Sequence, residues 1–258
     1  MTFPLSCENL RLNINGTDIL NDVTLDLPEG QITSIVGPNA SGKTTLLRCL
    51  SRLQRMSAGR VMLKGQDIHK MNTREVARQV AMLPQTVTAP PGMRVMELVA
   101  RGRTPHQAPL QQWSAEDAEI VTRAMDAVGI AHRAETMLDT LSGGQRQRAW
   151  IAMVLAQDTD ILLLDEPTTY LDLPHQRDVL QLVHDLQKQR GLTIVMVLHD
   201  INLAARYSDR IIALKDGALL YDGAPNEVIT YEAMQAIYGL ECSVLTDPHS
   251  GAPHIIPK

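Results

Sequence analysis

A glycine-rich segment at residues 37–44 carries the chemistry most easily recognised in this chain. It reads Gly-Pro-Asn-Ala-Ser-Gly-Lys-Thr and fits the pattern G-x-x-x-x-G-K-[ST] at every fixed position. Glycines in such a loop let backbone N–H groups turn inward around phosphate oxygens, and the N-terminus of a following helix adds positive potential. Lys43 is then expected to reach the β- and γ-phosphates of a nucleotide, and the Thr44 hydroxyl to ligate Mg²⁺. The candidate nucleotide-binding residues are Gly37, Pro38, Asn39, Ala40, Ser41, Gly42, Lys43, Thr44 and Thr45.

Two acids follow an apolar run further along the chain. Residues 161–164 are aliphatic, and Asp165 and Glu166 come directly after them. A carboxylate at the carboxyl end of a buried strand lies where α/β sheets bind ligands. We therefore expect Asp165 to be the second Mg²⁺ partner, directly or through water, and Glu166 to polarise the attacking water. A solvated strand end would also carry an acidic pair, but it would not require the glycine-rich loop that accompanies this one.

A third motif lies between these two. Residues 141–145 read Leu-Ser-Gly-Gly-Gln, and Ser142, Gly143 and Gly144 open a predicted helix that runs to Ala156. The start of a helix offers unpaired N–H groups, here together with a hydroxyl, to an anion. A plain helix cap followed by a flexible glycine pair is the alternative interpretation.

The elements that must position these motifs follow from the apolar pattern. Residues 5–36 alternate around an Asn15-Gly16 turn signal, which predicts an antiparallel strand pair and then a buried strand at 32–36. A helix is expected at 43–53, and helical periodicity fills residues 95–156 with a capped start at Ser114. Beyond it the pattern predicts strands at 160–165 and 192–198, helices at 174–189 and 200–207, a strand pair near 210–222 and a terminal hairpin at 240–257. Strands that alternate with helices favour an α/β fold with a mostly parallel sheet.

The chain is expected to form one domain, residues 1–258, in four parts. Residues 1–85 and 159–240 form the nucleotide-binding core, residues 86–158 a helical insertion, and residues 241–258 a C-terminal extension. An apolar content of 44% over 258 residues is enough for a substantial core. The net charge of -5 and the aromatic content of 3% argue against nucleic acid as a partner.

Cysteine use and the apolar runs bear on location. The three cysteines show no CxxC pairing, so they are expected to be reduced thiols of a cytosolic protein that serve as small buried hydrophobes. The N-terminus lacks the pattern of a signal peptide, and the apolar runs are of strand length. We expect a chain that is soluble by itself and docks on a membrane through partners.

With residues 141–145 added to the loop and the acids, nearly the whole chain resembles the ATPase subunits of ATP-binding cassette transporters. The resemblance implies a P-loop NTPase-type core with an N-terminal antiparallel β-subdomain and an inserted helical subdomain. It implies ATP and Mg²⁺ as cofactors. It also implies that Gln85 senses Mg²⁺ and the transmembrane partner, that His199 contacts the γ-phosphate, and that Asp172 belongs to the family's D-loop.

The resemblance further implies a site shared between two chains. In the family, two subunits lie head to tail and bury two ATP molecules. The γ-phosphate held by one subunit is then bound by the motif of the other, here Ser142, Gly143, Gly144 and Gln145. Neither chain of such a homodimer has a complete site alone.

Three stretches narrow the resemblance to one group of importers. Residues 98–107, 146–157 and 247–257 are similar to the ATPases that import ferric enterobactin and related iron–siderophore complexes. That group implies two transmembrane permease subunits, indirectly a periplasmic substrate-binding protein, and a peripheral position on the cytoplasmic face of the bacterial inner membrane. Importers of haem and cobalamin have closely similar ATPases, so the cargo stays open at this point.

Two other classes of function are weaker interpretations. A soluble cassette ATPase that acts on ribosomes or DNA usually has two cassettes or long coiled coils, and this chain has one cassette and no heptad run. A regulatory module without turnover would be expected to lack the acid at position 166, where Glu166 stands.

The chain departs from the family pattern at the base of the nucleotide. The family often stacks adenine on an aromatic residue in the N-terminal strand pair, whereas residues 12–16 contain no aromatic and offer only apolar contact from Ile14. We therefore predict weak discrimination between bases.

Arg101, Arg103 and His106 form a basic cluster that fits either a solvated helix end or a surface facing the transmembrane partner.

Overall fold

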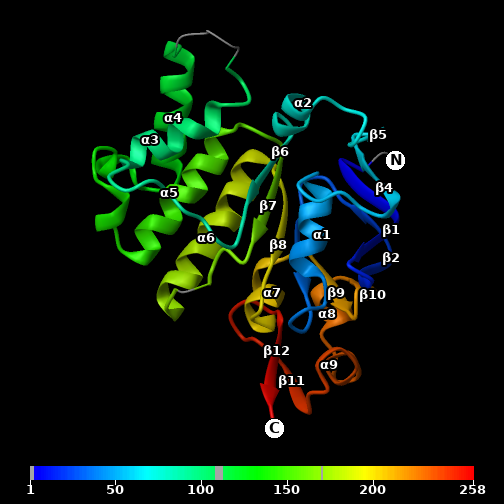
Figure 1. Cartoon of the computed structure of the whole chain (residues 1–258). Coiled ribbons are helices and arrows are strands. Elements are labelled where there is room, and N and C mark those ends of the chain that lie inside the picture. The colour runs from blue at the N-terminus through cyan, green and yellow to red at the C-terminus, as the bar shows by residue number, and fades with distance from the viewer. Residues whose placement is uncertain (1–2, 108–112, 170) are drawn as a thin grey trace.

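The computed structural model describes residues 3–107, 113–169 and 171–258 (Figure 1). Its centre is a six-stranded sheet in the order β10-β9-β3-β8-β7-β6. The strands are β3 (Ile32–Val36), β6 (Val80–Leu83), β7 (Ile161–Asp165), β8 (Thr193–Val197), β9 (Arg210–Lys215) and β10 (Ala218–Gly223). Neighbouring strands are parallel except β9 and β10. The predicted mostly parallel α/β core is confirmed.

Both faces of this sheet are covered, which explains its apolar runs. Every residue of β3, β7 and β8 is buried. In β7, Leu162 and Leu164 pack on the side of α6 (Leu173–Arg190), while Ile161 and Leu163 pack on the side of α1 (Lys43–Leu50). Strands that are buried on both faces are apolar at consecutive positions instead of at alternate ones.

A second sheet, in the order β2-β1-β4-β5, is antiparallel throughout. It consists of β1 (Leu5–Ile14), β2 (Thr17–Leu27), β4 (Ala58–Leu63) and β5 (Gln66–Asp67). Asn15 and Gly16 join β1 to β2 with φ values of 52° and 86°, as the turn signal predicted. Helix α1 packs its leucines against both β1 and the central strands, so it holds the two sheets together. The predicted N-terminal antiparallel β-subdomain is confirmed.

The helical subdomain stands to one side of the central sheet (Figure 1). It contains α3 (Val95–Ala100), α4 (Ala115–Ala127) and α5 (Gly143–Ala156). Ser114 caps α4 by accepting a hydrogen bond from the Asp117 N–H (3.0 Å), as the sequence predicted. The predicted segment 86–158 also includes residues 108–112, which lie outside the described residues.

The basic cluster is partly internal. The Arg103 Nε donates to Asp117 Oδ1 at 2.9 Å, and both side chains are less than 10% exposed (6% and 8%). His106 Nε2 lies 2.7 Å from the Gln157 carbonyl oxygen. These bonds tie the 3₁₀ turn Arg101–Arg103 to α4 and to the end of α5. Both interpretations of the cluster, a solvated helix end and a partner-facing surface, are therefore wrong for Arg103, because its charge is buried and paired within the chain.

The remaining elements are α2 (Thr73–Ala77), α7 (Ile201–Tyr207), α8 (Pro225–Val228), α9 (Tyr231–Tyr238), β11 (Cys242–Thr246) and β12 (Pro253–Pro257). Strands β11 and β12 pair antiparallel, which confirms the terminal hairpin. The sequence did not predict α8 and α9. The helix expected at 43–53 ends at Leu50, because Arg52 takes a left-handed φ of 63°.

Two further sequence expectations concern the cysteines and the membrane. Cys7, Cys49 and Cys242 are free and buried, which confirms their interpretation as small hydrophobes. Among the described residues, no helix combines the length and the apolar character needed to cross a membrane.

Candidate nucleotide site

Four adjacent parallel strands end at one edge of the central sheet, and a predicted site residue follows each of them. The glycine-rich loop follows β3, His199 follows β8, Asp165 and Glu166 close β7, and Gln85 follows β6. These strands are neighbours in the order β3-β8-β7-β6. Ligands of α/β proteins bind beyond the carboxyl ends of such strands. The fold therefore brings together residues that are up to 162 positions apart, from Gly37 to His199.

The loop at residues 37–44 needs both of its glycines. At Gly37 (φ 145°) a Cβ would lie 2.1 Å from the Leu214 carbonyl oxygen, and at Gly42 (φ 97°) it would lie 2.8 Å from the Ile19 carbonyl oxygen. Both positions combine a left-handed φ with backbone in close approach, so only glycine fits. The sequence pattern thus corresponds to a steric requirement of this fold.

The lysine of the loop is buried and folded back over its own turn. Lys43 Nζ donates to the carbonyl oxygens of Gly37 (2.8 Å) and Pro38 (2.7 Å). Burial lowers the pKa of Lys43, and the nearby charges of Glu166 and Asp165 oppose that effect. The Ser41 Oγ beside it is buried, without a hydrogen-bond partner in the described part of the chain. A buried polar atom without a partner is costly, so the loop fits an anion with several acceptor oxygens.

Thr44 and Asp165 form the candidate metal centre. The Thr44 hydroxyl donates to Asp165 Oδ1 at 2.9 Å, and the side chain of Asp165 is buried at the end of β7. The second carboxylate oxygen, Oδ2, is buried without a partner among the described residues. Burial raises the pKa of Asp165, while the hydrogen bond from Thr44 opposes the shift. A set of hard oxygen donors with one buried oxygen unsatisfied fits Mg²⁺.

Glu166 is held by three side chains. Its Oε1 lies 2.6 Å from His199 Nε2, and its Oε2 accepts hydrogen bonds from Gln85 Nε2 (2.6 Å) and from the Thr169 hydroxyl (2.8 Å). Burial raises the pKa of Glu166, but the hydrogen bonds from Thr169, His199 and Gln85 together outweigh burial and leave this pKa lowered. The carboxylate is therefore ionised at neutral pH and able to accept a proton. The sequence did not single out Thr169.

The loop, Glu166 and His199 enclose one cavity of about 300 Å³. Its lining consists of Ile19, Asn39, Ala40, Ser41, Gly42, Lys43, Thr44, Thr45, Glu166 and His199. Ile19 of β2 was missed by sequence reasoning, because β-strand alternation alone does not reveal which strand meets the loop. Ile14, named from the sequence as a base contact, is 43% exposed at the end of β1 and is not among the lining residues.

The motif at residues 142–145, predicted as an anion site, lies apart from that cavity. Ser142 Oγ accepts from the Gln145 N–H at 3.3 Å, and Gln145 Oε1 accepts from the Ser142 N–H at 3.2 Å. This reciprocal pair caps α5 and fixes the entry of the chain into the helix. Gly143 lines a separate groove of about 250 Å³, together with Gln85, Glu166 and Thr169.

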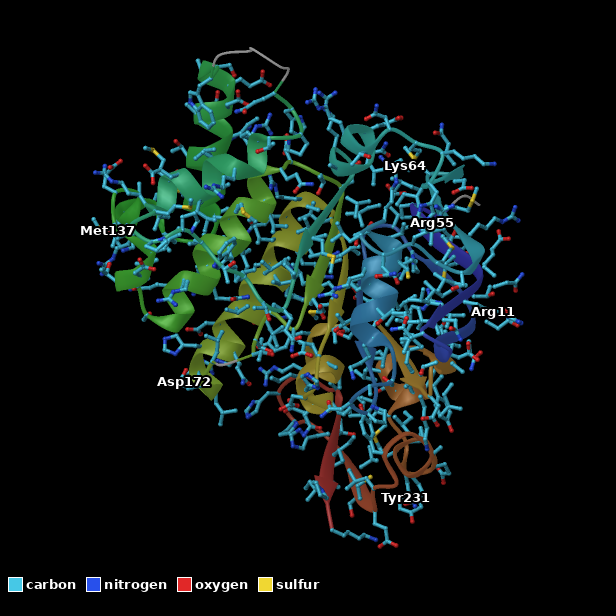
Figure 2. All side chains as sticks on the ribbon, viewed as in Figure 1. Arg11, Arg55, Lys64, Met137, Asp172 and Tyr231 are labelled. Carbon is cyan, nitrogen blue, oxygen red and sulfur yellow. The ribbon has the colours of Figure 1, made fainter. Side chains whose placement is uncertain are left out.

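Asp172 adjoins the same motif. It caps α6 by accepting from the His175 N–H at 3.3 Å, and its carboxylate also pairs with His175 Nδ1. The ring of His175 rests on Gly144, where a Cβ would lie 2.6 Å from the His175 Cδ2. Figure 2 shows Asp172 at the end of α6, on the opposite side of the molecule from Arg11, Arg55 and Lys64 of the β-subdomain region. The contact of His175 with Gly144 was not predicted from the sequence.

The comparison with known families decides what this arrangement belongs to. A family model described as "ABC transporter" matches residues 20–169, which include the loop, residues 141–145 and the acids. The chain belongs to the ABC transporter family.

Individual ABC proteins are similar over almost the full length. The ferric enterobactin transport ATP-binding protein FepC of Escherichia coli (strain K12) is 50% identical over 250 residues, which cover 97% of this chain and 92% of the relative. Among solved structures, an inward-facing putative metal-chelate type ABC transporter matches with a TM-score of 0.87 and 28% identity, and covers 100% of this chain and 98% of its own. A dimeric ATP-binding cassette bound to ADP and Pi matches with a TM-score of 0.74 and 28% identity, over 85% of this chain and 98% of its own.

Proposed function

We propose that this chain is the ATP-hydrolysing subunit of a bacterial importer of iron–siderophore complexes, and that it works as a head-to-tail homodimer on two permease subunits. The observation that carries the proposal is the contact of Glu166 with both His199 and Gln85 beside the glycine-rich loop. Three parallel strands bring these groups to one point beside the loop. The loop contributes the buried Lys43 and the Ser41 hydroxyl, which has no hydrogen-bond partner in the part of the chain that the structure describes, and both fit phosphates.

Hydrolysis by these residues is a matter of positioning and electrostatics. The N–H groups of the loop and the Lys43 ammonium bind the phosphates, and Thr44, Asp165 and Gln85 are the residues that would hold Mg²⁺. A bound Mg²⁺ would supply positive charge to the phosphates during hydrolysis. Glu166 orients a water molecule and accepts its proton. His199, whose side chain is 48% exposed, turns from Glu166 to the γ-phosphate.

The position of residues 142–145 supports a second copy of this chain in the complete site. Ser142, Gly144 and Gln145 form the capped start of α5, a helix of 14 residues. None of them lines the cavity beside the glycine-rich loop of the same chain. The positive end of a helix binds an anion, and the γ-phosphate held by a second chain supplies one. Asp172 lies beside this motif and belongs to the same contact with the second chain. The dimeric cassette with ADP and Pi supports this arrangement.

The parts of the chain have separate roles in this proposal. Residues 1–85 and 159–240 bind and hydrolyse ATP, residues 86–158 carry the motif and face the permease, and residues 241–258 form an extension. Iron–siderophore cargo is supported by the relative that shares 50% identity over 97% of this chain. The subunit would then lie on the cytoplasmic face of the inner membrane, with a periplasmic binding protein as an indirect partner. A net charge of -5 gives no support for nucleic acid as a partner.

The transported ligand and the need for ATP hydrolysis are tested together in a bacterial strain that lacks its own siderophore ATPase. The chain is supplied with its neighbouring permease and binding protein, and uptake of ferric siderophore, haem and cobalamin is measured. We expect uptake of ferric siderophore that is lost with Lys43→Ala. Uptake of haem or cobalamin alone would contradict iron–siderophore complexes as the cargo. Uptake unaffected by Lys43→Ala would overturn the role of ATP hydrolysis.

A further inference from the structure

We propose that Thr169 is a positioning residue for the reaction, because it anchors one oxygen of Glu166 and leaves the other free to hold the water. This inference rests on the proposed role of Glu166. Among the described residues, Glu166 has three side-chain donors, His199, Gln85 and Thr169, and only Thr169 shares its loop.

A closed turn places Thr169 at this point. The Thr169 N–H donates to the Glu166 carbonyl oxygen at 3.2 Å, and Pro167 occupies the second position of the turn. Proline is favoured there because its fixed φ suits the turn. Glu166 itself takes a left-handed φ of 52°. The backbone therefore brings the Thr169 hydroxyl to 2.8 Å from Glu166 Oε2 without help from any distant element.

The two carboxylate oxygens of Glu166 face different spaces. The partner of Oε1, His199, lines the phosphate cavity together with the loop. The partners of Oε2, Gln85 and Thr169, line the groove that also contains Gly143. Thr169 thus holds the oxygen that faces away from the phosphate cavity, and Oε1 is the oxygen that can reach an attacking water.

Binding of the nucleotide leaves Thr169 as the remaining anchor. In the proposed mechanism His199 turns to the γ-phosphate and Gln85 to Mg²⁺, so Glu166 loses two of its three donors. His199 follows β8 and Gln85 follows β6, so neither donor belongs to the turn that joins Glu166 to Thr169. Thr169 is fixed by its turn and keeps its bond to Oε2. Without this hydroxyl the carboxylate would be free to rotate just when its orientation matters.

The test compares Thr169→Val, which removes only the hydroxyl, with Thr169→Ser, which keeps it, in the full-length protein. Thr168→Val is the matched control, because Thr168 lies in the same turn and is not a donor to Glu166. Turnover of MgATP and binding of a fluorescent ATP analogue are measured. A misplaced catalytic group costs on the order of 100-fold, so we expect kcat to fall about 10- to 100-fold with valine. We expect KM and analogue affinity to change less than about twofold, and serine to restore kcat.

A double-mutant cycle with Glu166→Gln asks whether Thr169 acts through Glu166. Coupled residues show non-additive effects, so Thr169→Val should not lower the residual turnover of Glu166→Gln any further. Multiplied effects, or wild-type kcat in Thr169→Val, would overturn the proposal. If the valine variant does not fold, Thr169→Ala takes its place with the same expected outcome. If Glu166→Gln hydrolyses ATP normally, the proposed role of Glu166 is wrong. If Glu166→Gln is inactive but Thr169→Val is fully active, only the proposed role of Thr169 is wrong.

Discussion

Glu166→Gln is the substitution that most directly probes the chemistry of this site. The amide has nearly the shape of the carboxylate, so the turn at residues 166–169 and the packing at the end of β7 should survive. It cannot accept a proton from water, and its nitrogen must face either His199 or the pair Gln85 and Thr169, which donate to the carboxylate in the native site. General base catalysis contributes about 10²- to 10⁴-fold. At about 1.36 kcal/mol per decade this corresponds to roughly 3–5 kcal/mol of transition-state stabilisation.

Phosphate release and analogue binding, measured side by side, separate chemistry from affinity. We expect turnover to fall by about 10²- to 10⁴-fold while ATP affinity stays within a few fold, because Lys43, Thr44 and the loop are untouched. ATP that is bound but not hydrolysed should also stabilise a dimer, which size-exclusion chromatography with MgATP detects. Glu119→Gln, an exposed acid on α4, is the matched control and should behave as wild type. Near-normal turnover of Glu166→Gln would refute the assignment of the base.

Three other predictions concern the loop, a buried ion pair and the thiols. Gly42→Ala should abolish binding of an ATP analogue, because its φ of 97° and a backbone carbonyl oxygen 2.8 Å from the new Cβ strain the loop; affinity within threefold of wild type would contradict this. Arg103 holds the pKa of Asp117 below its usual value, so this stabilisation is present above about pH 4 and is lost as pH falls through the lowered pKa. Thermal melts of Asp117→Asn should therefore lie below wild type at pH 7, with a gap that narrows in acid. Burial raises the pKa of Cys7 and of Cys49 to about 12, so a thiol reagent at pH 8 should label neither until the protein unfolds.

The strands that carry the site could be predicted because their apolar runs end abruptly in polar motifs. The strand expected at 32–36 coincides with β3, and the run before Asp165 coincides with β7. Parallel pairing then requires the strand ends to meet at one edge. His199 and Gln85 were identified through the family resemblance, because a single histidine or glutamine after a strand carries no chemical pattern of its own.

The missed features depend on tertiary contacts or on short local signals. Ile19 lines the phosphate cavity only because β2 crosses beside the loop, and the contact of His175 with Gly144 depends on how α6 packs against α5. The bond from Thr169 to Glu166 is local, and the Pro167 turn was a usable signal. Helix α8 spans only Pro225–Val228, too short for hydrophobic periodicity to show.

Complementation between two inactive variants tests the central claim that two copies share each site. Ser142→Arg removes the motif of one chain, and Lys43→Ala removes the loop function of the other, so each homodimer lacks both complete sites. A mixed dimer keeps one, formed by the loop of the Ser142→Arg chain and the motif of the Lys43→Ala chain. In an equal mixture half of the dimers are mixed, so we expect ATPase activity to rise from near zero to roughly a quarter of wild type. Wild-type activity of Ser142→Arg alone, or no gain in a mixture that forms mixed dimers, would contradict a site shared between chains.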